Sequence, residues 1–471
     1  MALGRQKQER QDQWVSACDL PTSPGHPFYT KLNRLLDEAG FDEFVEQLCQ
    51  SYYAEKMGRP SIPPGVYFRM LFIGYLEGLS SQRAIAWRCS DSRSLQTFLG
   101  YGLTESTPDH SSLTRVRKRL PLEVHEAVFT FVLSIAKLKK LLKGNTVAVD
   151  STLIEADAAM KSIVRRDTGD DWKEYVRKLM AEEGIEDPSD EDIRKFDKKR
   201  KKKVSNKDWV SPNDPDARIA KMKDGRTHLA YKTEHAIDVQ SDLVLAAGVY
   251  YGDAADTATL STTLIQAQAH TMLAGSDAEI KDVIADKGYH STENLLQCEA
   301  WGLRSYIPER DQPGGRKWTD KPEEDKRAVY ANRRRVKGKR GRRLGRLRSE
   351  YVERSFAHVC ETGGARRSWL HGLEDVTKRY LMYAAGKNLG VLMRALFGMG
   401  KPRTLQAEGG DGSSTGRAGS LALWRRIAAV FGSCGAFHGD LAHRLGLDAF
   451  MPRNPSALGE HSNPHPICVA A

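Results

Sequence analysis

The segment LAYKTEHAIDVQSDLVLAAGVYY, residues 229–251, consists of two apolar runs separated by a short polar stretch. In its first run, every second residue falls on one face of an extended chain: Leu229, Tyr231, Thr233, His235, Ile237 and Val239. The polar residues 240–242 supply a turn, and the second run returns as a strand. This segment therefore predicts two antiparallel strands joined as a hairpin.

Outward from this hairpin lie two shorter apolar strands, TVAVD at 146–150 and DVIAD at 282–286. Helical patterns follow the predicted strands. The first begins with Asp256 as the predicted N-cap, and the last covers about residues 373–396. Strands alternating with helices in this order predict an α/β fold, a mixed sheet with helices packed on its faces.

A compact helical module is predicted at residues 61–120. One helix runs through VYFRMLFIGYLEG and ends at Gly78, and a second begins after Ser80 and Ser81. A third helix, HSSLTRVRKRL, opens after Asp109 and would expose Arg115, Arg117, Lys118 and Arg119. Three short helices ending in a basic one fit a helix-turn-helix-like DNA binder. The alternative is a plain helical bundle with a basic surface. Residues 122–142 predict one long helix that ends at Gly144.

The chain is basic, with a net charge of +11. Residues 333–348 hold ten Arg or Lys and no acid, and KKRKKK at 198–203 is a second basic run. Clustered cations indicate a polyanionic partner, although each run also fits a solvated loop. Residues 161–226 are almost entirely polar and predict an inserted excursion, partly helical and partly disordered. Residues 404–419 predict a Gly/Ser linker.

Several function classes are disfavoured by composition. The seven cysteines form no CxxC pair and no zinc spacing, so we expect buried fillers rather than disulfides or a zinc site. No window approaches the length of a membrane helix, and the N-terminus lacks a signal-peptide pattern. The sequence predicts a cytoplasmic protein.

The chemistry suggested by the residues is metal-dependent. Asp is rare in strands, yet Asp150 and Asp286 each close an apolar strand, and sheet edges of this kind are where α/β folds place ligands. Two adjacent carboxylates repel unless a cation lies between them, and Mg²⁺ or Mn²⁺ prefers such oxygens. Glu353, in YVERSF after the basic run, could complete a two-metal site. The alternative for each Asp is a turn or helix cap.

The strings VDSTLIEA, YKTEHAIDV with GDAADTATL, ADKGYHS and YVERSFAHV resemble, in order and context, insertion-sequence transposases with an RNase H-like core. PPGVYFRMLFIGYLEGLSSQRAI and TPDHSSLTRVRKRL resemble the N-terminal domain of the same group. The resemblance covers roughly residues 60–160 and 225–400. It implies a DDE transposase in which Asp150, Asp286 and Glu353 bind two Mg²⁺ (or Mn²⁺) ions and catalyse DNA cleavage and strand transfer.

The resemblance further implies double-stranded DNA as partner, at the element ends and at the target. It implies a homodimer or higher oligomer, no membrane or small-molecule cofactor, and a cytoplasmic place at the nucleoid. Besides the basic helix at 110–120, we expect DNA contacts from four residues near the motifs: Lys232, Lys287, Arg354 and Arg367. For Lys232 and Tyr289 a structural role is the alternative.

The sequence departs from some relatives that carry Tyr and Arg before the Glu and Lys after it. Here those positions hold Arg346, Ser349 and Cys360. The assignment of Glu353 as the third carboxylate therefore depends on the VERSF string, and Glu350 and Glu361 are the fallback candidates for that role.

The predicted domains are a polar arm with short helices at 1–60, a helical DNA-binding domain at 61–143, and an RNase H-like domain at 144–160 and 226–400. The insertion at 161–225 and a linker with tail at 401–471 complete the chain. Three alternative functions remain open at this point: a nuclease of the same fold, a non-catalytic DNA-binding protein descended from a transposase, and a basic RNA-binding protein.

Overall fold

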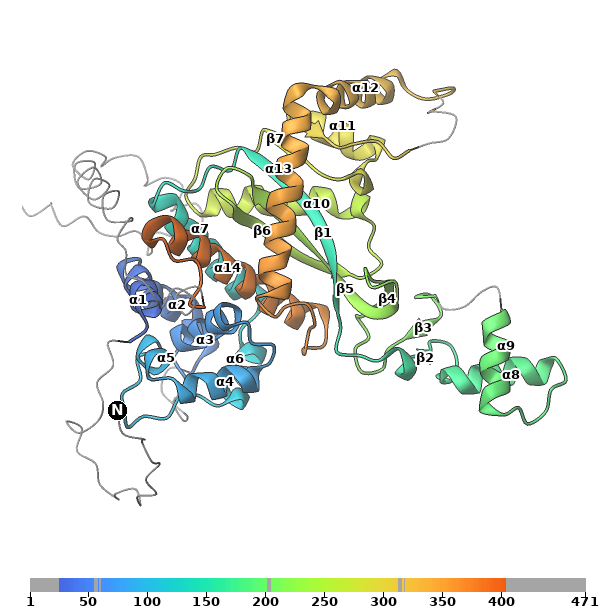
Figure 1. Ribbon diagram of the computed structural model, residues 1–471, viewed down its shortest axis with the longest axis horizontal. Helices are drawn as coiled ribbons and strands as arrows, with labels where there is room; N and C mark the ends of the chain where they lie inside the picture. The colour runs from blue at the N-terminus through green and yellow to red at the C-terminus, as the bar shows by residue number, and fades with distance from the viewer. Residues whose placement is uncertain are drawn as a thin grey trace, which may run out of the picture. The chain divides into compact units, whose positions relative to one another are not determined.

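The computed structural model describes residues 25–54, 58, 61–200, 205–311, 316 and 318–403. Its centre is a six-stranded sheet in which β4 and β6 both pair with β5, and β5 is followed by β1, β7 and β8. The strands are β1 Thr146–Glu155, β4 Arg218–Lys221, β5 Thr227–Asp238, β6 Leu243–Tyr251, β7 Asp282–Ile284 and β8 Arg304–Tyr306. β1 pairs antiparallel with β5 and parallel with β7, and β7 pairs parallel with β8. Helices flank this sheet (Figure 1), which confirms the predicted mixed α/β fold.

The predicted hairpin is confirmed as β5 and β6, with Asp242 at φ +63° in the turn between them. Both strands are almost fully buried because helices cover both faces of the sheet. Alternation along β5 therefore decides which helix a side chain meets. Lys232 and Glu234 reach Thr259 of α10, whereas His235 reaches the opposite face, where α13 and α14 pack.

The helices of the core are α10 Asp256–Leu273, α11 Thr292–Ala300, α12 Glu323–Lys337, α13 Lys339–Phe356 and α14 Leu373–Phe397. A 3-10 turn, Lys287–Tyr289, follows β7, and a π-helical turn, Ala357–Glu361, follows α13. Ser291 caps α11 by accepting the N–H of Asn294 at 3.0 Å. The basic run at 333–348 is helical and forms the end of α12 and most of α13, so the loop interpretation is wrong.

The N-terminal part is all-helical: α1 Pro27–Glu38, α2 Phe41–Cys49, α3 Pro64–Glu77, α4 Gln82–Asp91, α5 Arg93–Phe98, α6 His110–Arg119 and α7 Leu122–Leu138. A 3-10 turn, Gln50–Tyr52, follows α2. Three predicted boundaries are confirmed. Gly78 ends α3 at φ +67°, Ser81 caps α4, and the carboxylate of Asp109 caps α6. Helices α1 and α2 lie within the region 1–60 where short helices were predicted, whereas α5 was not predicted.

The long helix α7 ends earlier than predicted. It stops at Leu138, which is 66% exposed, rather than continuing to Leu142. Lys140 adopts φ +60°, and the N–H groups of Lys140 and Leu141 return to the carbonyls of Lys137 and Ala136. These hydrogen bonds satisfy the last carbonyls of the helix and end it. The apolar spacing, which continues to Leu142, therefore predicted a helix longer than the one observed.

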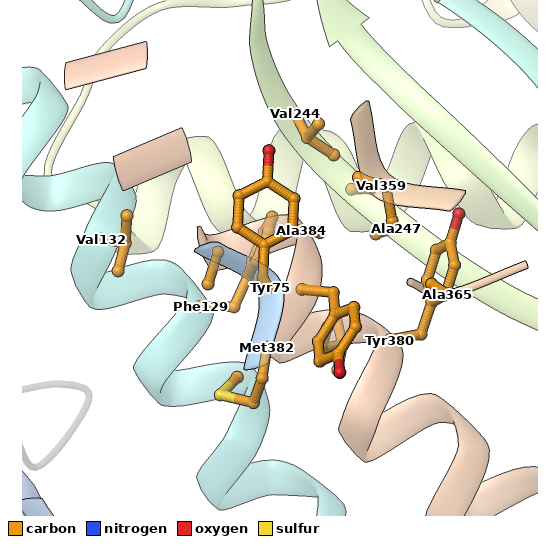
Figure 2. Packing of buried hydrophobic residues seen from close by; sticks show 14 of the residues in the cluster. Tyr75, Phe129, Val132, Val244, Ala247, Val359, Ala365, Tyr380, Met382 and Ala384 are labelled. Atoms are coloured by element: carbon orange, nitrogen blue, oxygen red, sulfur yellow. The ribbon is translucent and has the colours of Figure 1, made fainter. Parts of the chain in front are cut away.

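One hydrophobic core joins the N-terminal helices to the sheet (Figure 2). Its side chains come from α3, α7, β6 and α14, among them Tyr75, Phe129, Val132, Val244 and Met382. Tyr75 lies against Gly386 of α14, where an added Cβ would come within 2.7 Å of its ring. The glycine therefore permits the close packing of α14 against α3.

The polar insertion after β1 is largely ordered where it is described. It contains η3 Met160–Ser162, β2 Val164–Arg165, α8 Trp172–Glu182, α9 Asp190–Lys199 and β3 Trp209–Val210, with β2 paired to β3. Val176, Met180 and Ile193 form a small core between α8 and α9. The expectation of partial disorder is not supported for the described part of 161–226. Residues 201–204, the linker at 404–419 and the tail lie outside the described residues.

Four cysteines fall within the described residues, Cys49, Cys89, Cys298 and Cys360, and all are free and buried, as predicted. In the part of the chain that the structure describes, no helix has both the length and the apolar character needed to cross a membrane.

Candidate active site

Asp150 lies in the middle of β1, opposite His235 of β5. The prediction that its strand ends there is wrong, because pairing with β5 continues as far as Glu155. The side chain points to the face covered by α13, where the Arg348 guanidinium lies 2.5 Å from its Oδ2. Asp150 is thus held on a rigid strand and already paired with a cation.

Asp286 follows β7 by two residues and caps the short turn after it, since its Oδ1 accepts the N–H of Gly288 at 2.6 Å. A Cβ at Gly288 would lie 2.4 Å from Oδ2 of Asp256 and 2.8 Å from Oδ1 of Asp286. Both carboxylates therefore close around this position, and only glycine fits between them.

The two aspartates lie at matching heights of two neighbouring parallel strands, Asp150 within β1 and Asp286 just beyond the end of β7. Ala148 pairs with Ile284, and each aspartate is two residues further along its chain. Burial raises the pKa of Asp150, Arg348 opposes this rise, and the nearby Asp286 carboxylate adds to it. The structure therefore brings these two predicted site residues together, in surroundings where a cation stabilises their charges.

Glu353 lies on α13 between two points that fix this helix to the sheet. The first is the Arg348–Asp150 ion pair, and the second is the Ser355 hydroxyl, 3.0 Å from His235. Burial lowers the pKa of His235 to about 3, so the neutral ring bridges Ser355 and Tyr380. Because His235 is the cross-strand partner of Asp150, the helix passes directly over the predicted site.

The Glu353 side chain is exposed and points about 140° round the helix from Arg348. It therefore does not face Asp150 as Arg348 does. Among the described residues there is no group of three His, Cys, Asp or Glu side chains arranged to hold a metal. The fallback Glu350 pairs with Arg354, and the fallback Glu361 pairs with Arg366. The third ligand stays a prediction, and both Glu353 and the fallback Glu350 lie on the helix that crosses the site.

A second charged cluster lies on the opposite face of β1, and sequence reasoning missed it. Lys232 lies 2.8 Å from Asp256 and 3.3 Å from Glu234. The Ser151 hydroxyl donates to Asp256 at 2.9 Å, and the Tyr289 hydroxyl donates to Glu234 at 2.9 Å. Asp256 is the first residue of α10 while Ala255 is the N-cap, so the predicted capping role is wrong.

Two family models match this chain. A transposase DDE domain matches residues 142–386, and a transposase domain (DUF772) matches residues 17–119. The chain belongs to the DDE transposase family. Neither the curated proteins nor the solved structures include a match. The DDE match covers more than half of the sequence and spans Asp150, Asp286 and Glu353, so it places all three carboxylates inside the catalytic domain of the transposase.

The basic residues predicted to contact DNA differ in their exposure to solvent. In the transposase Arg115, Lys118 and Arg119 are exposed on α6, with Arg119 over the ring of Tyr53. Arg117 is only 7% exposed, so the prediction of an exposed side chain is wrong for it.

Four more predicted DNA contacts lie nearer the candidate site. Lys287 and Arg367 are exposed beside Asp311 and Asp157, and Arg354 is half-buried beside Asp242. Lys232 is 3% exposed, which favours its structural alternative.

Arg117 fixes α6 to α14. Its Nε lies 3.0 Å from Asp375, and its guanidinium lies over Trp369. We expect Arg117→Ala to lower the free energy of unfolding by about 1–3 kcal/mol, since a buried charge-assisted hydrogen bond is lost. Urea denaturation measures this. Lys118→Ala, an exposed neighbour, is the control and should stay within about 0.5 kcal/mol of wild type. Equal stability of both variants would contradict the anchoring role.

Proposed function

We propose that the protein cuts DNA at the ends of an insertion sequence and joins those ends to target DNA. The observation that carries this proposal is the proximity of Asp150 in β1 and Asp286 just after the parallel strand β7, within a DDE transposase domain. The finer steps, cleavage followed by strand transfer, extend the family's general role in DNA transposition. They are supported by Glu353, which is exposed on the helix whose Arg348 pairs with Asp150.

The donor set fits divalent cations. Asp150 and Asp286 are neighbouring carboxylates, and the charge of Asp286 raises the pKa of Asp150, which is already paired with Arg348. Such carboxylate oxygens are the ligands that Mg²⁺ and Mn²⁺ prefer. We propose that Asp150, Asp286 and Glu353 hold two such ions, which when bound would activate the nucleophile and stabilise the leaving oxygen. β1 and β7 fix the two aspartates, while α13 presents Glu353. The exposed Lys287, next to Asp286, can bind a DNA phosphate.

Cleavage at two ends of one element requires two active sites to act together, so the proposed form is a homodimer or larger assembly on double-stranded DNA. Its place would be the nucleoid in the cytoplasm. The exposed cations of α6 and the half-exposed site at α13 support a DNA partner.

The test uses the full chain, Mg²⁺ and duplexes carrying the DNA that flanks its gene. Denaturing gels would resolve nicked ends and, with a target plasmid, joined products. We expect both. Cleavage without joining would instead indicate a nuclease of the same fold. Binding without cleavage would indicate a non-catalytic relative, and preference for RNA with no cleavage would indicate an RNA-binding protein.

Arg348 gives a separate prediction for metal binding. Its guanidinium occupies Oδ2 of Asp150, so an ion must displace it. We expect Arg348→Gln to bind Mn²⁺ about 10-fold more tightly than wild type, because one charge-assisted hydrogen bond no longer competes. Isothermal titration with Mn²⁺ measures this without DNA. Arg346→Gln, an exposed arginine on the same helix, is the matched control. Weaker Mn²⁺ binding by Arg348→Gln would show that Arg348 supports the site instead of competing with the ion.

A further inference from the structure

The basic run at 333–348 divides into two kinds of side chain. Several of its arginines are bound to acceptors of the protein itself. Arg333 pairs with Glu309 at 2.6 Å, Arg335 donates to the carbonyl of Ser305 at 2.9 Å, and Arg340 pairs with Asp282. Together with Arg348, these cations hold α12 and α13 on the sheet. Positive charge alone therefore does not identify a ligand surface in this run.

Arg342 and Arg346 are different. Both are exposed, and within the described ranges neither guanidinium forms a hydrogen bond or an ion pair. With Ser349 and Glu353 they recur at intervals of four, three and four residues, so all four lie along one face of α13. We call this line of residues the Glu353 face. The buried side of α13 carries Gly341, Leu344, Val352 and Phe356 instead.

Gly345 lies beside the Glu353 face and is not required by the packing of the protein. A Cβ added there would meet no atom within 4 Å, whereas one at Gly341 would lie 2.2 Å from the carbonyl oxygen of Arg335. Glycine inside a helix costs about 1 kcal/mol relative to alanine. A helical glycine with open space around it fits a place where a ligand approaches the backbone closely.

We propose that the Glu353 face binds the sugar-phosphate backbone of the DNA strand that enters the active site, through Arg342 and Arg346. This rests on the proposed function, since it takes Glu353 as the end of the path. Arg346 is about 10 Å and Arg342 about 16 Å from Glu353 along the helix. At about 3.4 Å per nucleotide, they reach phosphates about three and five nucleotides from the scissile one.

The charge pattern favours DNA over an acidic protein. Both guanidinium groups lie on one straight line about 6 Å apart, a spacing of about two nucleotides along a strand. The line ends at Glu353, on the helix whose Arg348 pairs with Asp150. Phosphate oxygens accept two parallel N–H bonds from arginine, which a mobile, unpaired side chain can offer.

The test measures binding of the full chain to a 30-base-pair duplex of arbitrary sequence by fluorescence anisotropy, at several salt concentrations and without divalent metal. Phosphate contacts are sequence-independent, and each contributes about 0.9 to the slope of log Kd against log salt. For Arg342→Ala/Arg346→Ala we expect a slope smaller by about 1.8 and binding at least about 10-fold weaker at 0.1 M salt.

The matched control is Arg334→Ala/Lys337→Ala, which removes the same charge from exposed positions of α12. It should keep most of the wild-type slope. A second variant, Gly345→Glu, places a negative charge beside the face at a position with room for a side chain, and should weaken binding while keeping the thermal melting point.

An unchanged slope for the arginine variant, an equal loss in the control, or tighter binding to an RNA duplex would overturn the proposal. The two hypotheses fail separately. Normal cleavage with an unaffected salt slope removes the Glu353 face alone. Loss of slope in a protein that never cleaves DNA removes the proposed function and leaves the binding surface.

Discussion

Asp286→Asn is expected to reduce the rate of DNA cleavage by at least about 10³-fold while leaving the protein folded. Asparagine has the same shape, and its amide oxygen can still accept the N–H of Gly288, which Asp286 now accepts at 2.6 Å. What it loses is the negative charge next to Asp150. The variant keeps one carboxylate where the wild type has two, so its affinity for divalent ions is expected to be lower.

The measurement is single-turnover cleavage of the flanking-DNA duplex, with Mn²⁺ titration and thermal melting in parallel. Asp253→Asn is the matched control, because Asp253 is an exposed acid in the same sequence neighbourhood as Asp256 and contacts Asn206. It should cleave at the wild-type rate. If Asp286→Asn also cleaved at that rate, Asp286 would have no part in the chemistry.

Sequence patterns located the sheet and two carboxylates because both are local properties. Alternation over 229–239 and the apolar runs before Asp150 and Asp286 are visible within a few residues of chain. The parallel pairing of β1 with β7 is not local, since these strands are separated by an insertion, a hairpin and a helix. The sequence could therefore name the aspartates, while only the sheet register shows that they meet.

Charged residues were the least predictable part of the site. Arg117 and Arg348 each lie among similar basic neighbours, and Lys232 is a lone lysine within a strand, so nothing in the local pattern indicates which of these cations has a buried partner. Their partners are Asp375, Asp256 and Asp150, all distant in sequence. Tertiary placement of an acid decides whether a cation is a buried anchor or an exposed ligand-binding group.

The dependence of charged residues on distant partners also explains why the basic run at 333–348 was interpreted as a possible loop. The run at 333–348 looked loop-like because few of its residues are apolar, yet Leu344 and the acids under Arg333 and Arg340 suffice to hold two helices. A signal was present in Leu344, Val352 and Phe356, spaced for one helical face. It was hidden by the density of charge around it.

Lys232→Met is expected to lower the free energy of unfolding by about 3–5 kcal/mol, because it leaves buried carboxylates without their cation. Glu234 is 0% exposed and Lys232 is 3% exposed, so water screens neither. Burial and the carboxylates of Glu234 and Asp256 raise the pKa of Tyr289 well above its usual range, so its hydroxyl stays protonated and adds no further negative charge to the cluster. Urea denaturation of both proteins measures the difference.

The double variant Lys232→Met/Glu234→Gln separates charge from packing, since it removes the cation together with one of its anions. It should be more stable than Lys232→Met alone. The phosphate-binding alternative for Lys232 predicts the opposite pattern: normal stability, with a loss of DNA affinity. The burial of Lys232 against Asp256 argues for the first outcome. Asp256 in turn accepts a hydrogen bond from Ser151 and lies against Gly288, so the cation helps to hold the chain beside both aspartates of the proposed site. A Lys232→Met protein of wild-type stability would show that the cluster carries no buried charge that needs neutralising.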